Sequence, residues 1–196
     1  MTDRPPRDTD EKLLRAAVDL MADRGYNGVT TREIADAAGL SEKTLFRRFG
    51  TKRNLLETAF DRYHYGTEMM KLFHEKLVWE LRTDLLLVAR TYHTLMNANR
   101  KMILISIKDE GHLPGFRERT RKHPVQLMEG LASYFREMAG KGRMRPGDPE
   151  LQAAAFLMLN FGMFMNDLEA GSSLPGIHLD PLIEESVAIF ARGLAP

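Results

Sequence analysis

The sequence has no cysteine among its 196 residues, which excludes disulfide bonds, thiolate zinc sites and cysteine nucleophiles. No uncharged run approaches the roughly 18 residues that a membrane-spanning helix needs, and no apolar segment follows the opening MTDRPPRDTDEK. These absences predict a soluble cytoplasmic protein that makes no use of a membrane.

A large excess of charge of either sign is also missing. Charged residues make up 28% of the chain, but the net charge is only +1. The whole molecule therefore lacks the strong field of a nucleic-acid coat or a membrane-surface protein, and any site for a polyanion must be local.

Acidic residues are absent from one short segment, residues 43–53, which holds five cations: Lys43, Arg47, Arg48, Lys52 and Arg53. A helix charged for solubility usually mixes signs so that residues four apart can pair, whereas a helix that lies against phosphates does not. The segment therefore favours contact with a polyanion. The alternative is an ordinary solvated helix face.

The alternating pattern of β-strands is almost absent, whereas apolar residues recur at helical spacing between capping signals. A hydrophobic content of 43% is enough to bury the core of one or two domains. We therefore predict an all-α protein.

The first two helices are predicted from their caps. Asp8 should begin the first helix, with Glu11 completing a capping box, and Gly25 should end it. Thr30 should begin the second helix, with Glu33 reaching back in the same way. Small apolar residues in the second helix allow a neighbouring helix to approach closely.

A third helix should start at its cap Ser41 and run through EKTLFRRF. At about 100° per residue, one side carries the polar residues Lys43, Thr44, Arg47 and Arg48, and the roughly opposite side carries Leu45 and Phe49. Two short helices joined by AGLS, of which the second is basic, fit a helix-turn-helix, whose second helix enters the DNA major groove.

The stretch VTTREIADAAGLSEKTLFRRFGTKRNLL strongly resembles the DNA-binding segment of the TetR family of bacterial transcription regulators. The resemblance covers roughly residues 14–60 and includes RGY at residues 24–26, TTREIA at 30–35, AGLS at 38–41 and TLFRRFGTK at 44–52. It implies a helix-turn-helix DNA-binding domain over residues 1–53 and a larger helical ligand-binding and dimerisation domain over residues 54–196.

Three residues depart from the common pattern of that family. Lys43 stands where glycine is common, Phe46 where tyrosine is common, and Arg48 where histidine is frequent. Lys43 and Arg48 add positive charge, and Phe46 has no hydroxyl to donate to a phosphate. Phe46 should therefore make an apolar contact, for example with a thymine methyl group.

The predicted DNA-binding residues fall into two groups. Those expected at phosphates are Thr30, Thr31 and Lys52, and those expected at base edges are Lys43, Thr44 and Arg47, with Arg48 shared between base and backbone. Ser41, the cap of the third helix, and Phe46 complete the predicted surface. For each of these residues the alternative is a solvated surface side chain.

The remainder of the chain predicts a helical body. A fourth helix should run from Lys52 to the region of His64, followed by clear helices over residues 79–100, 123–140, 149–170 and 180–194 and an apolar helix within residues 101–116. The helix over residues 150–168 is apolar nearly all round, so it needs cover on more than one side. Pairing of the last two helices in a homodimer supplies that cover; packing in the monomer core is the alternative.

The body is rich in methionine and phenylalanine, as in FLMLNFGMFMND at residues 156–167. Methionine adapts to varied partners, so this composition favours an apolar, deformable pocket for a small effector. The predicted ligand-binding residues are Tyr92, His93, Asn97, Asn160 and Asp167 as polar groups, with Trp79 and Phe164 as walls. Ordinary core packing is the alternative for each of them.

An enzyme is the least favoured class. The cluster DEGH offers Asp109, Glu110 and His112 as metal ligands, but no second ligand set follows at a metal-binding spacing, and HExxH, GxSxG and phosphate-binding glycine loops are absent. We expect no catalytic residue, cofactor or metal. The sequence therefore predicts a ligand-responsive repressor that binds a palindromic DNA operator as a dimer; the alternative is a DNA-binding regulator that acts through a protein partner.

Overall fold

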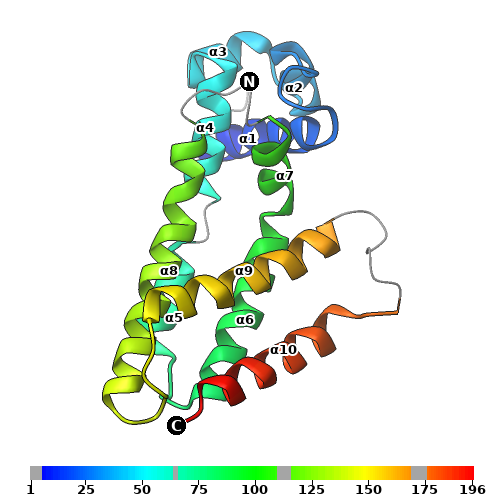
Figure 1. The fold of residues 1–196 in the computed structure, drawn as a ribbon. Helices are drawn as coiled ribbons and strands as arrows, with labels where there is room; N and C mark the ends of the chain where they lie inside the picture. The colour runs from blue at the N-terminus through cyan, green and yellow to red at the C-terminus, as the bar shows by residue number, and fades with distance from the viewer. Residues whose placement is uncertain (1–5, 64–65, 110–115, 169–175) are drawn as a thin grey trace. The chain divides into compact units, whose positions relative to one another are not determined.

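The computed structural model describes residues 6–63, 66–109, 116–168 and 176–196. Within these ranges all regular secondary structure is helical, which confirms the predicted all-α class. The helices are α1 (Pro6–Arg24), α2 (Thr31–Ala37), α3 (Glu42–Phe49), α4 (Lys52–Arg62), α5 (Gly66–Glu75), α6 (Leu81–Ala98), α7 (Arg100–Lys108), α8 (Phe116–Gly140), α9 (Pro149–Leu168) and α10 (Leu179–Leu194), as Figure 1 shows.

The chain divides into two compact units. The first contains residues 1–64 and 99–120, and the second contains residues 65–98 and 121–196. The predicted domain boundary at residue 53 separates the proposed DNA-binding residues from the rest of the chain, and it stays a prediction. The compact unit around the helix-turn-helix reaches further, because α4 and α7 contribute to its hydrophobic core.

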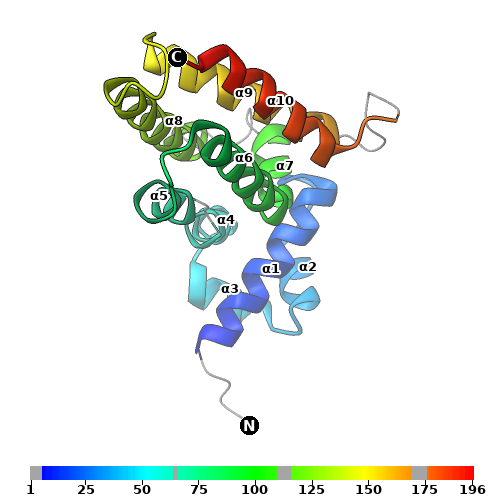
Figure 2. The same cartoon turned by 90° about the horizontal axis from the view of Figure 1, so that it is seen from below.

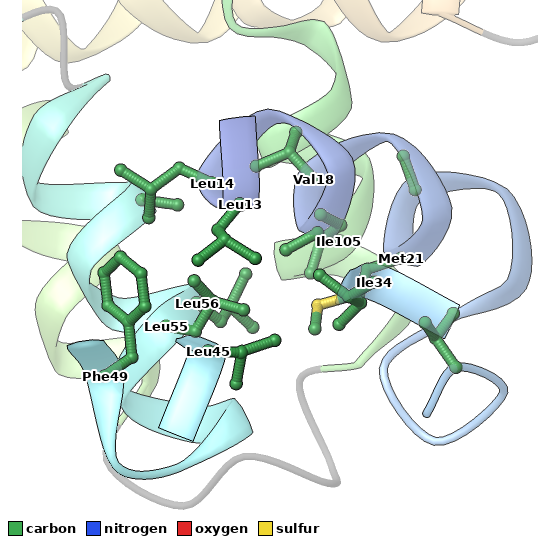
Figure 3. Close-up of a cluster of buried hydrophobic side chains, with 14 of the residues drawn as sticks. Leu13, Leu14, Val18, Met21, Ile34, Leu45, Phe49, Leu55, Leu56 and Ile105 are labelled. Carbon is green, nitrogen blue, oxygen red and sulfur yellow. The ribbon is translucent and has the colours of Figure 1, made fainter. Parts of the chain in front are cut away.

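The core of the first unit is a single cluster of buried side chains (Figure 3). Its members include Leu13, Leu14 and Met21 of α1, Ile34 of α2, Leu45 and Phe49 of α3, Leu55 and Leu56 of α4, and Met102 and Ile105 of α7. Each fully buried leucine or isoleucine contributes about 1.5 to 3 kcal/mol of burial free energy relative to exposure. The cluster thereby holds α2 and α3 in one fixed geometry.

The predicted start of α1 is wrong by two residues. The helix begins at Pro6, because the first helical turn does not need the N–H that proline lacks. Asp8 lies inside this turn and pairs with Lys12 at 3.0 Å. Glu11 does not complete a capping box; it accepts a hydrogen bond from the Tyr63 hydroxyl at 2.7 Å.

The caps predicted further along are confirmed. Gly25 ends α1 with φ of +76°, a conformation that glycine adopts without steric cost. Thr30 and Glu33 form the capping box of α2, and Ser41 caps α3 by accepting from the Thr44 N–H. These signals are local, so they can be recognised without knowledge of the tertiary fold.

The second unit contains α5, α6, α9, α10 and α8 from residue 121 onward. Figures 1 and 2 show α9 and α10 side by side, and α6 packs against both. The separate helix α5 was not predicted from the sequence. Among the described residues, no helix combines the length and the apolar character that crossing a membrane requires.

Candidate DNA-binding surface

Helix α3 presents opposite faces to the core and to solvent. Leu45 is 0% exposed and Phe49 is 7% exposed, so these two side chains anchor the helix to the first unit. Lys43 and Arg47 are exposed on the other face, and the ring of Phe46 is 46% exposed beside them. The predicted orientation of the amphipathic helix is confirmed.

The five cations of residues 43–53 are not equivalent. The guanidinium of Arg48 lies 3.5 Å from Asp10 of α1, and that of Arg53 lies 2.9 Å from Glu57 of α4. Both acids lie outside the segment, so the local sequence pattern did not reveal them. Lys43 and Arg47 are exposed, and within the described residues neither side chain has a hydrogen bond or an ion pair.

Lys52 differs most from its predicted placement at a phosphate. Its ammonium donates to the backbone carbonyl of Val29 and lies 4.2 Å from the centre of the Tyr26 ring. Burial lowers the pKa of Lys52, although the Asp109 carboxylate acts in the opposite direction. The side chain therefore ties α4 to the turn before α2, and its contact with a phosphate stays a prediction.

The polar residues at the helix ends hold the two helices together. Thr31 donates its hydroxyl hydrogen to Glu42 at 2.6 Å, which links the first turn of α2 to the first turn of α3. Ser41 accepts from the Thr44 N–H at 3.2 Å, and the two hydroxyls are 2.9 Å apart. Glu42 could not be predicted from the local sequence, because its contact with Thr31 depends on the angle between α2 and α3.

A turn of the first unit is held from a distant point in the chain. Asp109, the residue after α7, is 5% exposed and accepts a hydrogen bond from the Tyr26 N–H at 2.8 Å. Asp109, a candidate metal ligand of the DEGH cluster, is therefore already hydrogen-bonded to the backbone of this turn. Glu110 and His112 lie outside the described residues, and within those residues no group of three acidic or histidine side chains could hold a metal.

The second unit contains an apolar cavity of about 280 Å³ between α6, α8 and α9. It is lined by Tyr92, Met96, Pro124, Leu127, Met128, Ala154, Leu157, Met158 and Phe161. Tyr92 is the predicted ligand-binding residue that reaches it. Trp79 lines a separate cavity between α5 and α8.

The other predicted ligand-binding residues line neither cavity. His93 and Asn160 are buried at 3% and 1% exposure; burial lowers the pKa of His93, and the Asn160 side chain acts in the opposite direction. Phe164 is fully buried, Asn97 is exposed and Asp167 is half-buried. Their roles in binding stay predictions.

Comparison with known proteins agrees with this geometry. Residues 13–59 match the family described as bacterial regulatory proteins of the tetR family. The HTH-type transcriptional regulator YvkB of Bacillus subtilis is 26% identical over 96% of this chain and 98% of its own. The HTH-type transcriptional repressor AcnR of Corynebacterium efficiens is 28% identical over 93% of this chain and 94% of its own.

The fold is also found among solved structures. A TetR-family transcriptional regulator from Mesorhizobium loti superposes with a TM-score of 0.73 at 22% identity, over 99% of this chain and 100% of that one. At this identity the likeness concerns the fold.

Proposed function

We propose that this chain, whose residues 13–59 match the bacterial regulatory proteins of the tetR family, is a DNA-binding transcription regulator that acts as a ligand-responsive repressor. It binds a palindromic operator as a homodimer and leaves the operator when a small, largely apolar effector binds. The observation that carries this proposal is that Lys43 and Arg47, two exposed cations of α3, form no ion pair within the described residues.

Arg47 and Lys43 are the residues best placed to read bases. Both lie on the solvent face of a helix whose opposite face is locked into the core, so the backbone needs no rearrangement to enter a major groove. An arginine can donate two hydrogen bonds to the edge of a guanine, and the exposed Phe46 ring can contact a thymine methyl group. The unpaired cations also keep their full attraction for phosphates.

The exposed apolar side chains of α9 and α10 support a homodimer. Leu151 and Met158 are 68% and 74% exposed, Leu159 is 41% exposed and, on α10, Ile189 is 58% exposed. A second copy of the same two helices would cover these side chains in an interface of four helices. The α3 helices of the two copies, related by a two-fold axis, would then fit a palindromic operator.

Sedimentation tests the dimer directly. Ile189→Glu and Leu159→Glu place a charge in the proposed interface and should convert the protein to monomers. Val78→Glu changes a side chain that is 60% exposed elsewhere in the second unit and should leave the dimer intact. A monomeric wild-type protein, or a dimer that tolerates both charges, would contradict the interface.

The cavity between α6, α8 and α9 is the proposed effector site. Its lining is apolar apart from the Tyr92 hydroxyl, and three of its residues are methionines, which can adapt to ligands of different shape. The two α3 helices of the dimer can adopt different spacings. An effector that binds more tightly to the dimer with one of these spacings shifts the population toward it. If that spacing does not match the operator, effector and DNA weaken each other's binding equally.

A neutral fluorescent probe can report occupancy of this cavity. N-phenyl-1-naphthylamine should gain fluorescence on binding the wild-type protein, and Ala154→Phe, which fills the cavity, should abolish the gain. Ala98→Phe makes the same change at an exposed position at the end of α6 and serves as the matched control. If Ala154→Phe has no effect on binding, the effector site lies elsewhere.

Selection from a random pool of duplex DNA tests the operator. Enrichment of a palindrome whose half-sites lie about one helical turn apart, with binding that weakens steeply as salt increases, is the expected result. If a palindrome is enriched but no small molecule releases it, the protein acts through a protein partner instead. If no sequence is enriched, α3 is not the DNA-recognition helix.

A further inference from the structure

The cavity between α5 and α8 differs in chemistry from the proposed effector site. It measures about 420 Å³, within the usual range for small-molecule sites. It is lined by Met70, Phe73, His74, Leu77, Trp79, Gln126, Glu129, Gly130, Ser133, Tyr134 and Glu137. Aromatic rings and two carboxylates thus line one space.

The aromatic wall consists of Trp79 and Tyr134, whose ring centres are 5.6 Å apart at an interplanar angle of 32°. Phe73 of α5 lines the same cavity, and its ring packs against Gly130 of α8. A Cβ atom at this glycine would lie 3.0 Å from the Phe73 ring. The absence of a side chain at Gly130 therefore leaves room for the Phe73 ring against the backbone of α8.

Trp79 is held in an unusual backbone conformation. Its φ is +63°, which is rare for a bulky side chain and is typical of positions where surrounding contacts maintain strain. The buried carboxylate of Asp84 accepts the N–H groups of Val78 and Glu80, the residues on either side, at 2.9 and 3.0 Å. The Trp79 carbonyl accepts from Arg143 at 2.9 Å.

Tyr134 joins this arrangement from α8. Its hydroxyl donates to Asp84 at 2.9 Å, and burial, together with this carboxylate, raises the pKa of Tyr134 far above its usual value. The phenol therefore stays protonated and keeps donating. One buried carboxylate thus positions both rings of the wall, so a ligand would find the indole already ordered.

The face of the indole already holds a cation. The ammonium of Lys141 lies 3.1 Å from the centre of the Trp79 ring and 3.3 Å from the Glu137 carboxylate. An aromatic face and a carboxylate together form the pair of groups that recognises an organic ammonium ion. Glu129 adds a second carboxylate two turns earlier on α8.

We propose that this cavity is a second small-molecule site, which binds an organic cation consisting of an ammonium group attached to an apolar or aromatic body. The ammonium group takes the position of the Lys141 side chain over Trp79, and the body lies against Phe73 and Leu77. An anionic ligand is disfavoured by Glu129 and Glu137. The site is independent of the apolar cavity and of DNA binding.

The single tryptophan of the chain makes the test specific, because its emission comes from Trp79 alone. Benzyltrimethylammonium should quench this emission saturably. Neopentylbenzene, in which carbon replaces the charged nitrogen at the same shape, should bind at least about tenfold more weakly. Lack of saturable quenching by the cation, or equal binding of the neutral compound, would overturn the proposal.

Two variants test how charged side chains at the cavity affect binding of the cation. Lys141→Met removes the internal competitor and should tighten binding of the cation severalfold, whereas Glu129→Gln, at an exposed position, should weaken it about fivefold. Ala154→Phe, in the apolar cavity, should change nothing. If Lys141→Met binds the cation no better than wild type, or if Ala154→Phe abolishes quenching, the ligand does not occupy the position over Trp79.

Discussion

The carboxylate of Asp109 accepts a hydrogen bond from the backbone N–H of Tyr26 at 2.8 Å, across a separation of 83 residues. Tyr26 lies in the turn that leads from α1 toward α2, directly after Gly25, and Asp109 directly follows α7. The side chain oxygens of Asp109 lie within 4 Å of where a Cβ atom of Gly25 would be. The turn between α1 and α2 is thus held by Asp109, the residue that follows α7 in a distant part of the chain.

Replacement of Asp109 by alanine should destabilise the first unit. The change leaves the part-buried N–H of Tyr26 without its acceptor, and the loss should be about 2 kcal/mol in the free energy of unfolding. Asp109→Asn keeps one oxygen that can accept and should lose less. Urea denaturation followed by circular dichroism measures both values.

Asp19→Ala is the matched control for this experiment. It removes a carboxylate that pairs with Lys101 of the same helix α7 at 2.7 Å, but the pair is exposed and should contribute less than about 1 kcal/mol. If Asp109→Ala is no more destabilising than Asp19→Ala, the hydrogen bond to Tyr26 does not hold the turn.

Arg47→Ala should weaken operator binding by about 1 to 3 kcal/mol and relax the preference at one base pair, because a bidentate contact with guanine would be lost. Competition binding with the selected operator and its single-base variants measures both effects. Arg136→Ala removes the same charge from an exposed position in the second unit and should leave the base preference unchanged. Uniform weakening on all sequences by Arg47→Ala would instead assign Arg47 to a phosphate.

Local residues were enough to predict much of the first unit. The caps Thr30 and Ser41 accept from N–H groups three residues further on, so their roles follow from spacing alone. The buried positions of Leu45 and Phe49 follow from the helical period. These features do not depend on any distant segment.

Contacts between distant segments could not be predicted in this way. The ion pair between Arg48 and Asp10 depends on the angles at which the helices cross, and so does the hydrogen bond from Lys52 to the Val29 carbonyl. The cavities likewise depend on helix packing, and they separated Trp79 from Tyr92, which the sequence placed together. Apolar residues suited to a pocket and to a core are the same, so composition alone did not locate the lining.

The capping box of α2 predicts a specific dependence on pH. The backbone N–H and the hydroxyl of Thr30, together with the Arg24 guanidinium, lower the pKa of Glu33 from 4.5 to about 2. The stabilisation by the Glu33 carboxylate should therefore be present above pH 4.5 and be lost as the pH falls toward 2. The free energy of unfolding of wild type and Glu33→Gln, measured from pH 7 to pH 2, should converge in this window.

Glu185→Gln serves as the control for that comparison. Its carboxylate pairs with Arg192 on the exposed surface of α10, so its removal should change the free energy of unfolding little at any pH. A direct titration of the Glu33 carboxyl by NMR should give a midpoint near 2. A midpoint close to 4.5 would show that the capping box does not persist in solution.

The buried carboxylate of Asp84 should be the most sensitive position in the second unit. Asp84→Asn replaces one acceptor oxygen by an NH₂ group that faces other donors, so it should destabilise the protein by about 3 kcal/mol. Tyr134→Phe removes only the hydroxyl that donates to this carboxylate and should cost about 1 kcal/mol. Urea denaturation ranks the two variants.

The fluorescence emission of Trp79 can distinguish a loss of overall stability from a local rearrangement of the backbone at residues 78–80. In Asp84→Asn the N–H groups of Val78 and Glu80 lose their charged acceptor, so the backbone at Trp79 should relax and the indole should become more exposed. A red shift of the emission below the unfolding transition is therefore expected for this variant. Tyr134→Phe keeps both backbone hydrogen bonds to Asp84 and should shift the emission less. Equal spectra for Asp84→Asn and wild type would mean that contacts of the ring, and not the carboxylate, maintain the positive φ of Trp79.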